Sequence, residues 1–236
     1  MRISLFLILF SYALGVTAQP INVYCLPGQG ADRHLFDSLQ LGSGYRLQFI
    51  EYGTPQRGMD MATFAQSLLV HLDTTAPFVL LGTSLGGMLS CELAEITHPQ
   101  KTIIISSAKN RRELPFRYRF QKKVPLYKIV PGRVMHFGAK MLQPLVEPDR
   151  NRNKSTFKKM LGAKHPQYMK RSVGLITGWE REHNTARVYH IHGAKDHTIP
   201  LRNVRAPDRV VADGSHMMTL TRGTAISALV LGILRE

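Results

Sequence analysis

The sequence predicts an α/β protein with a mostly parallel sheet flanked by helices. Short apolar runs rich in β-branched residues recur along the chain, which is typical of parallel strands covered on both faces. Segments with apolar residues at helical spacing lie between several of these runs, so strand and helix alternate. The alternation stops after Ser107, and about 80 residues pass before the next clear strand. This gap predicts a long insertion into the α/β domain.

Each predicted element follows from its residue pattern. The six strands are expected at Ile21–Leu26, Tyr45–Glu51, Phe78–Leu81, Thr102–Ser106, Arg187–Ile191 and Arg209–Ala212. Helical spacing of apolar residues predicts three helices outside the insertion, at Met59–Leu72, Ser84–Ile96 and Ala225–Leu234.

The composition is that of an ordinary globular protein. The chain has 236 residues, of which 44% are hydrophobic and 20% are charged. This balance argues against a largely disordered chain. No collagen repeat, heptad run or long apolar stretch occurs in the body of the chain, which excludes collagen, coiled coils and polytopic membrane proteins.

The net charge of +15 is concentrated in one segment. Residues 109–171 hold 18 of the 31 Lys and Arg residues and only 3 of the 16 Asp and Glu residues. Such an excess indicates an anionic partner, and aromatic residues interleave with the basic ones. No nucleic-acid-binding motif is present, so an anionic membrane surface or another polyanion is the expected partner. A solvated basic face without a partner is the alternative.

The first 18 residues resemble a secretory signal peptide. Arg2 precedes an apolar run that ends near Val16, and Val16-Thr17-Ala18 fits a cleavage site before Gln19. We expect a mature domain of residues 19–236 that is periplasmic or secreted. An uncleaved membrane anchor and a core element of the fold are the alternatives.

The two cysteines, Cys25 and Cys91, have no metal-ligand spacing and are expected to be buried free thiols. A disulfide between them is compatible with an exported protein but does not follow from two cysteines alone. The sequence indicates neither a metal site nor an organic cofactor.

A Gly-x-Ser-x-Gly motif marks a candidate nucleophile. Gly82-Thr83-Ser84-Leu85-Gly86 lies between a predicted strand and a predicted helix. In this setting the turn is so tight that residues two before and two after the serine must lack bulk, and the hydroxyl is exposed at the carboxyl edge of the sheet. The alternative is a glycine-rich turn with a capping serine.

A nucleophilic serine needs a base and a group that orients the base. His216 follows the last predicted strand, and Asp196 follows the penultimate one. Because parallel strands end at one edge of a sheet, we expect Ser84, Asp196 and His216 to meet there. Asp213 is the rival acid and His197 the rival base, but each is close in sequence to the group it would have to serve.

The expected oxyanion hole consists of two backbone N–H groups. One belongs to Leu85, directly after the nucleophile, and the other to Gln29 in the glycine-rich loop after the first strand. A flexible turn without this role is the alternative for the loop.

With these residues the chain resembles the α/β-hydrolase superfamily, and among its members the small serine esterases and thioesterases. The resemblance rests on the segments PGQG, GTSLGG, HGAKDHTIP and DGSH. It implies an α/β-hydrolase fold with a core of residues 19–107 and 186–236 and a basic helical cap at about 108–185. It places the nucleophile on Ser84, the acid on Asp196, the base on His216 and the oxyanion donors on Leu85 and Gln29. Pro27 and Thr83 stand where this superfamily often has His, which weakens any analogy of substrate.

The sequence therefore predicts a serine hydrolase that cleaves a carboxylic ester, with a small-molecule or lipid-like substrate. A thioesterase or acyltransferase with the same triad is one alternative. A non-catalytic binding protein for anionic envelope material is another.

Overall fold

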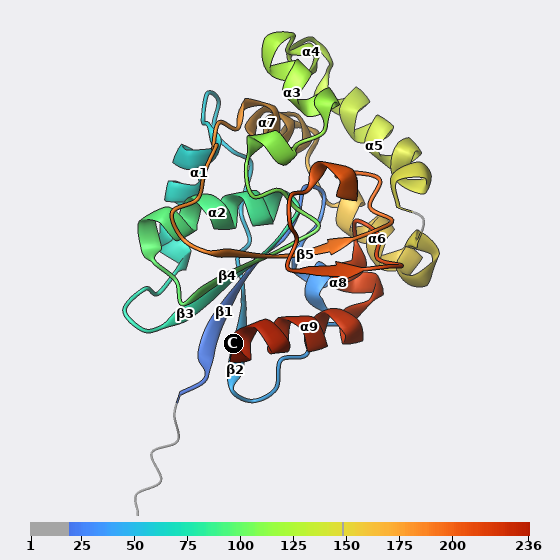
Figure 1. The fold of residues 1–236 in the computed structure, drawn as a ribbon. Helices are drawn as coiled ribbons and strands as arrows, with labels where there is room; N and C mark the ends of the chain where they lie inside the picture. The colour runs from blue at the N-terminus through green and yellow to red at the C-terminus, as the bar shows by residue number, and fades with distance from the viewer. Residues whose placement is uncertain (1–18, 148) are drawn as a thin grey trace, which may run out of the picture.

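The computed structural model describes residues 19–147 and 149–236, so the predicted signal peptide at residues 1–18 lies outside the described residues. Six strands form one parallel sheet in the order β2-β1-β3-β4-β5-β6 (Figure 1). Their bounds are β1 Ile21–Leu26, β2 Tyr45–Phe49, β3 Phe78–Thr83, β4 Lys101–Ile105, β5 Val188–Gly193 and β6 Arg209–Val211. The predicted parallel α/β sheet is confirmed, with all six strands where the apolar runs place them.

Both faces of the sheet are covered. Along β1, Tyr24 and Leu26 pack into one apolar cluster, whereas Val23 and Cys25 pack into another. This alternation is the two-residue period of a strand, and it explains why both sets of side chains are apolar. Cys25 and Cys91 are buried and free, and burial raises the pKa of both thiols.

The helices divide between the two faces. The first cluster is shared with α1 (Met61–Ser67), α2 (Leu85–Thr97) and α7 (Pro166–Gly178). The second is shared with α8 (Met218–Thr221), α9 (Gly223–Arg235) and α6 (Lys154–Gly162). Short 3-10 turns at Arg33–Phe36, Leu69–His71, Arg111–Glu113, Arg150–Asn153 and Leu201–Asn203 complete the elements.

One predicted helix is shorter than expected. The pattern over residues 59–72 predicts a single helix, but α1 covers only Met61–Ser67. The Asp60 side chain accepts a hydrogen bond from the Thr63 amide at 2.7 Å and so fixes the start of the helix. At the other end the chain tightens into the 3-10 turn, a common way for an α-helix to end.

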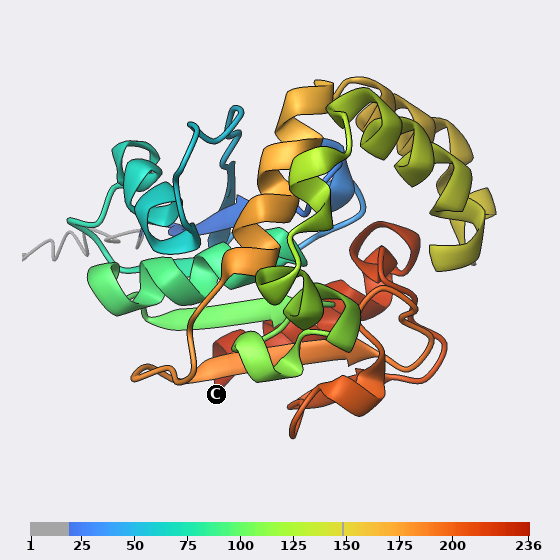
Figure 2. The ribbon, with the colours of Figure 1, turned by 90° about the horizontal axis from the view of Figure 1, so that it is seen from above.

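The insertion between β4 and β5 is helical and lies over the carboxyl edge of the sheet (Figure 2). Besides α6 and α7 it contains α3 (Phe116–Lys123), α4 (Leu126–Ile129) and α5 (Gly132–Val146). The end of the insertion is held to the core by Glu92, a buried residue of α2. Its carboxylate accepts hydrogen bonds from Arg181 at 2.7 and 2.8 Å and from the Trp179 indole N–H at 2.7 Å. Across residues 19–147 and 149–236, no helix has both the length and the apolar character of a membrane span.

Candidate active site

Ser84 occupies a strained turn between β3 and α2. Its backbone has φ 55° and ψ −121°, a conformation that a non-glycine residue rarely adopts. A Cβ atom on Gly86 would overlap the Leu26 carbonyl, and one on Gly82 would overlap the Gly86 carbonyl. The Ser84 amide donates to the Ile105 carbonyl at 3.1 Å, which pins the turn to β4. The motif's glycines are thus required by close packing of backbone.

His216 joins Ser84 to Asp196. The His216 Nε2 atom lies 3.0 Å from Ser84 Oγ, and its Nδ1 atom lies 2.8 Å from Asp196 Oδ2. An ionised carboxylate only accepts hydrogen bonds, so Nδ1 carries the proton and Nε2 offers its lone pair to the serine hydroxyl. This arrangement can take a proton from Ser84 as the oxygen attacks an electrophile.

Asp196 is held rigidly beneath the histidine. Its Oδ1 atom accepts hydrogen bonds from the amides of Thr198 and Ile199, each at 2.8 Å, which leaves Oδ2 for His216. The loops after β5 and β6 approach so closely that a Cβ on Gly193 would overlap the Gly214 carbonyl. The Lys195 amide donates to that carbonyl at 2.9 Å. The two glycines therefore bring together the loops that carry Asp196 and His216.

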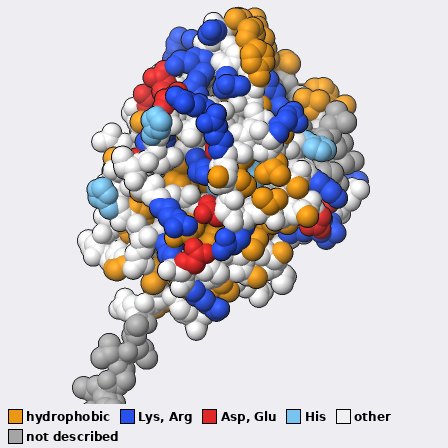
Figure 3. All heavy atoms as spheres, in the orientation of Figure 1, with side chains coloured by type: hydrophobic (Ala, Val, Ile, Leu, Met, Phe, Trp, Pro, Cys, Tyr) orange, Lys and Arg blue, Asp and Glu red, His pale blue; other side chains and the backbone are white. Residues whose placement is uncertain are grey.

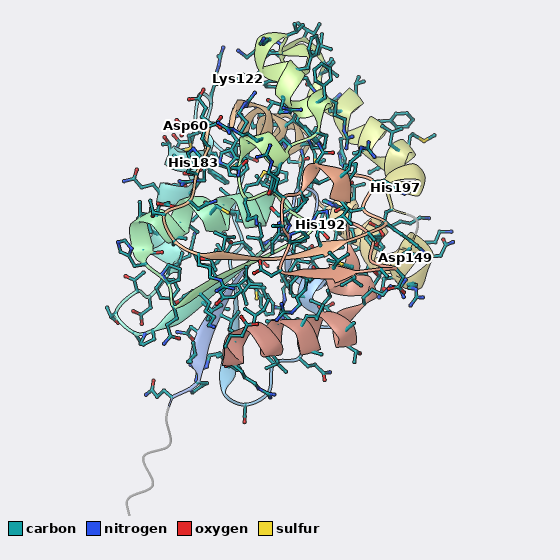
Figure 4. All side chains as sticks on the ribbon, viewed as in Figure 1. Asp60, Lys122, Asp149, His183, His192 and His197 are labelled. Atoms are coloured by element: carbon teal, nitrogen blue, oxygen red, sulfur yellow. The ribbon has the colours of Figure 1, made fainter. Side chains whose placement is uncertain are left out.

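The rival residues occupy other positions. The Asp213 carboxylate pairs with Arg222, and its side chain is about half exposed. His197 is exposed and lies on the wall of the site cavity, whereas His216 makes both hydrogen bonds of the series from Ser84 to Asp196. In Figure 4, His197 lies nearer the outline of the molecule than His192, which is buried.

The loop after β1 contacts the serine. A Cβ on Gly28 would lie 3.6 Å from Ser84 Oγ, so the backbone there passes directly beside the hydroxyl. The Gln29 side chain donates to the Met169 carbonyl at 3.1 Å and to Ser172 Oγ at 2.8 Å, which fixes the loop to α7. The Tyr52 hydroxyl donates to the Pro27 carbonyl. Leu85 begins α2 immediately after Ser84, at the positive end of the helix dipole.

The sequence model described as the Alpha/beta hydrolase family matches residues 10–229, nearly the whole chain. The chain belongs to this family. Family membership supports hydrolase activity.

Solved structures of similar fold include several hydrolases. This alpha/beta hydrolase is 14% identical to a hydrolase from Oleispira antarctica, with a TM-score of 0.72 and coverage of 92% of this chain and 91% of that one. It is 14% identical to the enol-lactonase from Burkholderia xenovorans LB400, with a TM-score of 0.70 and 92% coverage of both chains. It is 17% identical to a thermophilic esterase from Thermogutta terrifontis, with a TM-score of 0.65 and coverage of 92% and 90%. At these identities the likeness is one of fold. No curated protein matches the chain in sequence.

A cavity of about 420 Å³ opens onto Ser84 and His216 of this alpha/beta hydrolase. The core contributes Gln29 and Met88 to its wall, and the insertion contributes most of the remaining apolar surface. The aliphatic, Met and Phe side chains from the insertion are Ala139, Leu142, Phe157, Met160, Leu161, Met169 and Ile176. Among the described residues, no group of His, Cys, Asp and Glu side chains is arranged to hold a metal ion.

Glu147 is a site residue that the sequence analysis missed. It follows α5, is buried, lines the cavity and accepts a hydrogen bond from the Met217 amide at 2.9 Å, next to His216. Burial raises the pKa of this carboxyl group. The nearby His216 and the hydrogen bond from the Met217 amide lower the pKa, but burial has the larger effect. Burial alone would lower the pKa of His216, but the nearby Asp196 and Glu147 carboxylates raise it above its ordinary value. No local motif marks Glu147, because only the fold of the insertion brings it here.

Two further histidines, His190 and His192, belong to β5, and His192 lies next to Asp196. His192 Nε2 donates to the Ile199 carbonyl at 2.8 Å and lies 3.6 Å from Asp196 Oδ2. His192 Nδ1 then accepts from His190 Nε2 at 3.0 Å. Burial lowers the pKa of both, and for His190 the neighbouring His192 lowers it further, so both rings are neutral near pH 7. They support the loop that positions the acid.

Proposed function

We propose that this protein is a serine hydrolase that cleaves a carboxylic ester through an acyl-enzyme on Ser84. The observation that carries the proposal is the series of two hydrogen bonds, 3.0 and 2.8 Å long, that joins Ser84 to His216 and His216 to buried Asp196. The strained backbone of Ser84 between β3 and α2 adds to it, because this turn exposes the hydroxyl at the mouth of the cavity.

The proposed reaction has two halves. Ser84 Oγ attacks the ester carbonyl carbon while His216 Nε2 takes the hydroxyl proton. The tetrahedral intermediate collapses, the bond to the alcohol oxygen breaks, and His216 returns the proton to the departing alcohol. Water then attacks the acyl-enzyme with His216 again as base, which releases the carboxylic acid and restores Ser84.

The other assigned residues stabilise charge. Asp196 holds the proton-bearing side of His216 and stabilises the imidazolium that forms in each half-reaction. The amides of Leu85 and Gln29 are assigned to the developing oxyanion, since both lie on backbone next to Ser84. The anchoring of Gln29 to α7 keeps that loop in place without requiring movement during the reaction.

The proposed substrate is a small-molecule or lipid-like ester. The cavity is walled mainly by apolar side chains, which suits an acyl chain rather than a charged group. The names of the structural neighbours, an esterase and an enol-lactonase, describe ester-cleaving enzymes and agree with this class.

A panel of p-nitrophenyl esters from short to long acyl chains tests the proposal. The folded wild-type protein should turn over at least one of them, and Ser84→Ala should not. Thiol and alcohol leaving groups on the same acyl chain then separate an esterase from a thioesterase or acyltransferase. Absence of turnover throughout would favour a non-catalytic binding protein.

We also propose that the protein is exported and that cleavage after Ala18 leaves a mature chain starting at Gln19. Mass spectrometry of the protein purified from its native host should find this N-terminus. A soluble species that retains residues 1–18 would contradict the export proposal.

A further inference from the structure

We infer that residues 116–142 form a docking surface for an anionic lipid membrane. This docking surface comprises α3, α4 and the greater part of α5, at the end of the molecule opposite α9 (Figure 1). Figure 3 shows hydrophobic and basic side chains gathered over this end.

The docking surface exposes the apolar side chains that a soluble protein normally buries. Nine of the twelve large hydrophobic side chains that are exposed among the described residues lie within it. Ile129 is 78% exposed, Phe116 68% and Phe137 65%. Phe116 and Phe120 stand one helical turn apart with ring centroids 5.6 Å from each other. A cluster of this kind marks an interaction site, whereas single exposed apolar residues do not.

The charge of the docking surface has one sign. Residues 116–142 contain seven Lys or Arg residues and no Asp or Glu. Within the described chain, only Lys122 of the seven pairs with an acidic side chain, that of Glu180, while Arg117 donates to the backbone carbonyl groups of His197 and Thr198. The other five basic residues are exposed: Arg119, Lys123, Lys128, Arg133 and Lys140.

Helix α5 shows how the two kinds of residue are arranged. Val134, Phe137 and Met141 are spaced by three and four residues, so they share one face of the helix, and all three are exposed. Arg133 and Lys140 are seven residues apart, so both lie along the same side of this apolar strip. Helices that lie in a membrane interface have this pattern, with an apolar face in the acyl boundary and basic residues at the headgroups.

An anionic membrane fits these observations better than other occupants. A soluble polyanion would pair with the basic residues but would leave the apolar side chains in water. A second copy of the chain would cover the apolar side chains but would bring two surfaces of the same charge together. Anionic lipid satisfies both, because its headgroups attract Lys and Arg and its acyl chains accept the apolar side chains.

The docking surface adjoins the site cavity. Leu142 is exposed and also lines the cavity, and Arg117, Tyr118 and Ala139 from the same helices line it as well. An acyl chain leaving a membrane at this surface would therefore enter an apolar cavity that leads to Ser84. This part of the inference rests on the proposed function and names its substrate as an ester resident in the membrane.

Cosedimentation of Ser84→Ala protein with vesicles tests the docking itself. Vesicles of phosphatidylcholine alone are compared with vesicles that also contain phosphatidylglycerol, at low and moderate salt. We expect strong binding only to the anionic vesicles, weakening as salt is added, because the Debye length is about 8 Å at physiological ionic strength. Binding to heparin without binding to either vesicle would overturn the inference.

Two variants separate the contributions of charge and apolar contact. A variant with Lys123, Lys128, Arg133 and Lys140 changed to Gln should bind anionic vesicles at least about tenfold more weakly, given about fivefold per basic residue before screening. A second variant, with Phe116, Ile129 and Phe137 changed to Ser, should lose the binding that persists at moderate salt.

Two matched control variants make the same number and kind of changes elsewhere on the surface. Arg46, Arg57, Arg202 and Arg235 changed to Gln remove four exposed charges, and Val70, Ile96 and Val210 changed to Ser remove three exposed apolar side chains. Both controls should bind like the Ser84→Ala parent. Equal losses in the docking variants and their controls would overturn the docking surface.

The inference that the substrate is an ester resident in the membrane is tested separately, by hydrolysis rates of proteins that retain Ser84. The docking variants should hydrolyse a soluble short-chain ester at the wild-type rate but a long-chain ester within anionic vesicles at least about tenfold more slowly. An equal rate on the vesicle ester would overturn the membrane-resident substrate. Vesicle binding by a protein that hydrolyses no ester would instead overturn the proposed function and leave the docking surface standing.

Discussion

The carboxyl edge of the sheet and the surface of α3–α5 use similar side chains in opposite ways. At the sheet edge, apolar side chains are buried on both faces of the strands, and the three polar groups that meet there are linked by hydrogen bonds. On α3–α5, apolar side chains are exposed beside basic residues that mostly lack acidic partners among the described residues. Outside residues 109–171 the chain carries 13 basic and 13 acidic residues, so its net charge belongs to the insertion.

This difference indicates that the two regions have different roles. At the sheet edge, backbone amides fix Asp196 and close glycine contacts fix the turns that carry Ser84 and His216, as a preorganised active site requires. Nothing in the folding of the sheet requires exposed Phe and Ile side chains on α3–α5, so these are better explained by a partner. Under the proposals above, one region performs the reaction and the other brings the protein to its substrate.

The largest expected effect distinguishes two acids at the sheet edge. Asp196→Asn should lower kcat by about 10⁴-fold, because the neutral amide no longer selects the His216 tautomer or stabilises its charged form. Asp213→Asn should change kcat less than about tenfold, since its carboxylate pairs with Arg222 rather than His216. Steady-state kinetics on the best ester from the panel measures both. A severe loss in Asp213→Asn with a mild one in Asp196→Asn would reverse the assignment.

A second expected effect concerns the contact between Glu92 of α2 and the end of the insertion. Glu92→Ala should lower the free energy of unfolding by about 2–3 kcal/mol, because it leaves the buried Trp179 N–H without its acceptor and leaves Glu95 as the remaining carboxylate partner of Arg181. Denaturant unfolding followed by circular dichroism measures this.

The control for the Glu92 variant is Glu182→Ala, which removes an exposed carboxylate paired with Arg112. It should cost less than about 1 kcal/mol. A similar small cost for Glu92→Ala would mean that the insertion is fastened to the core elsewhere.

Sequence patterns predict what depends on local geometry. The apolar runs predict all six strands, and the spacing of Gly82 and Gly86 identifies the turn at Ser84, because backbone crowding alone demands those glycines. Its place after the penultimate strand makes Asp196, rather than Asp213, the predicted acid, but the amides of Thr198 and Ile199 that hold its carboxylate in the structure are not encoded by any short motif. Glu147 and the exposed apolar face of α5 depend on how the insertion folds back, so the sequence predicts the basic charge but not these positions.

The smallest expected effect links the insertion to the reaction. The active form of His216 is neutral, so kcat/KM should rise with pH through a pKa above the ordinary histidine value. The Glu147 carboxylate helps to raise that pKa, so Glu147→Gln should move the acidic limb to lower pH. The rate at higher pH should change little.

The matched control for the pH profile is Glu182→Gln, an exposed glutamate of the same insertion. Its acidic limb should coincide with that of the wild type. An unchanged limb in Glu147→Gln, or a shift to higher pH, would show that Glu147 does not act on His216.

Labelling with a fluorophosphonate probe tests the central claim most directly, because it requires no knowledge of the natural ester. An activated Ser84 Oγ attacks phosphorus and displaces fluoride, which leaves a stable adduct. The account predicts one adduct, on the peptide that contains Ser84, with labelling abolished by Ser84→Ala and strongly slowed by His216→Ala. Folded wild-type protein that takes up no probe, or Ser84→Ala protein that is labelled at the wild-type rate, would contradict it.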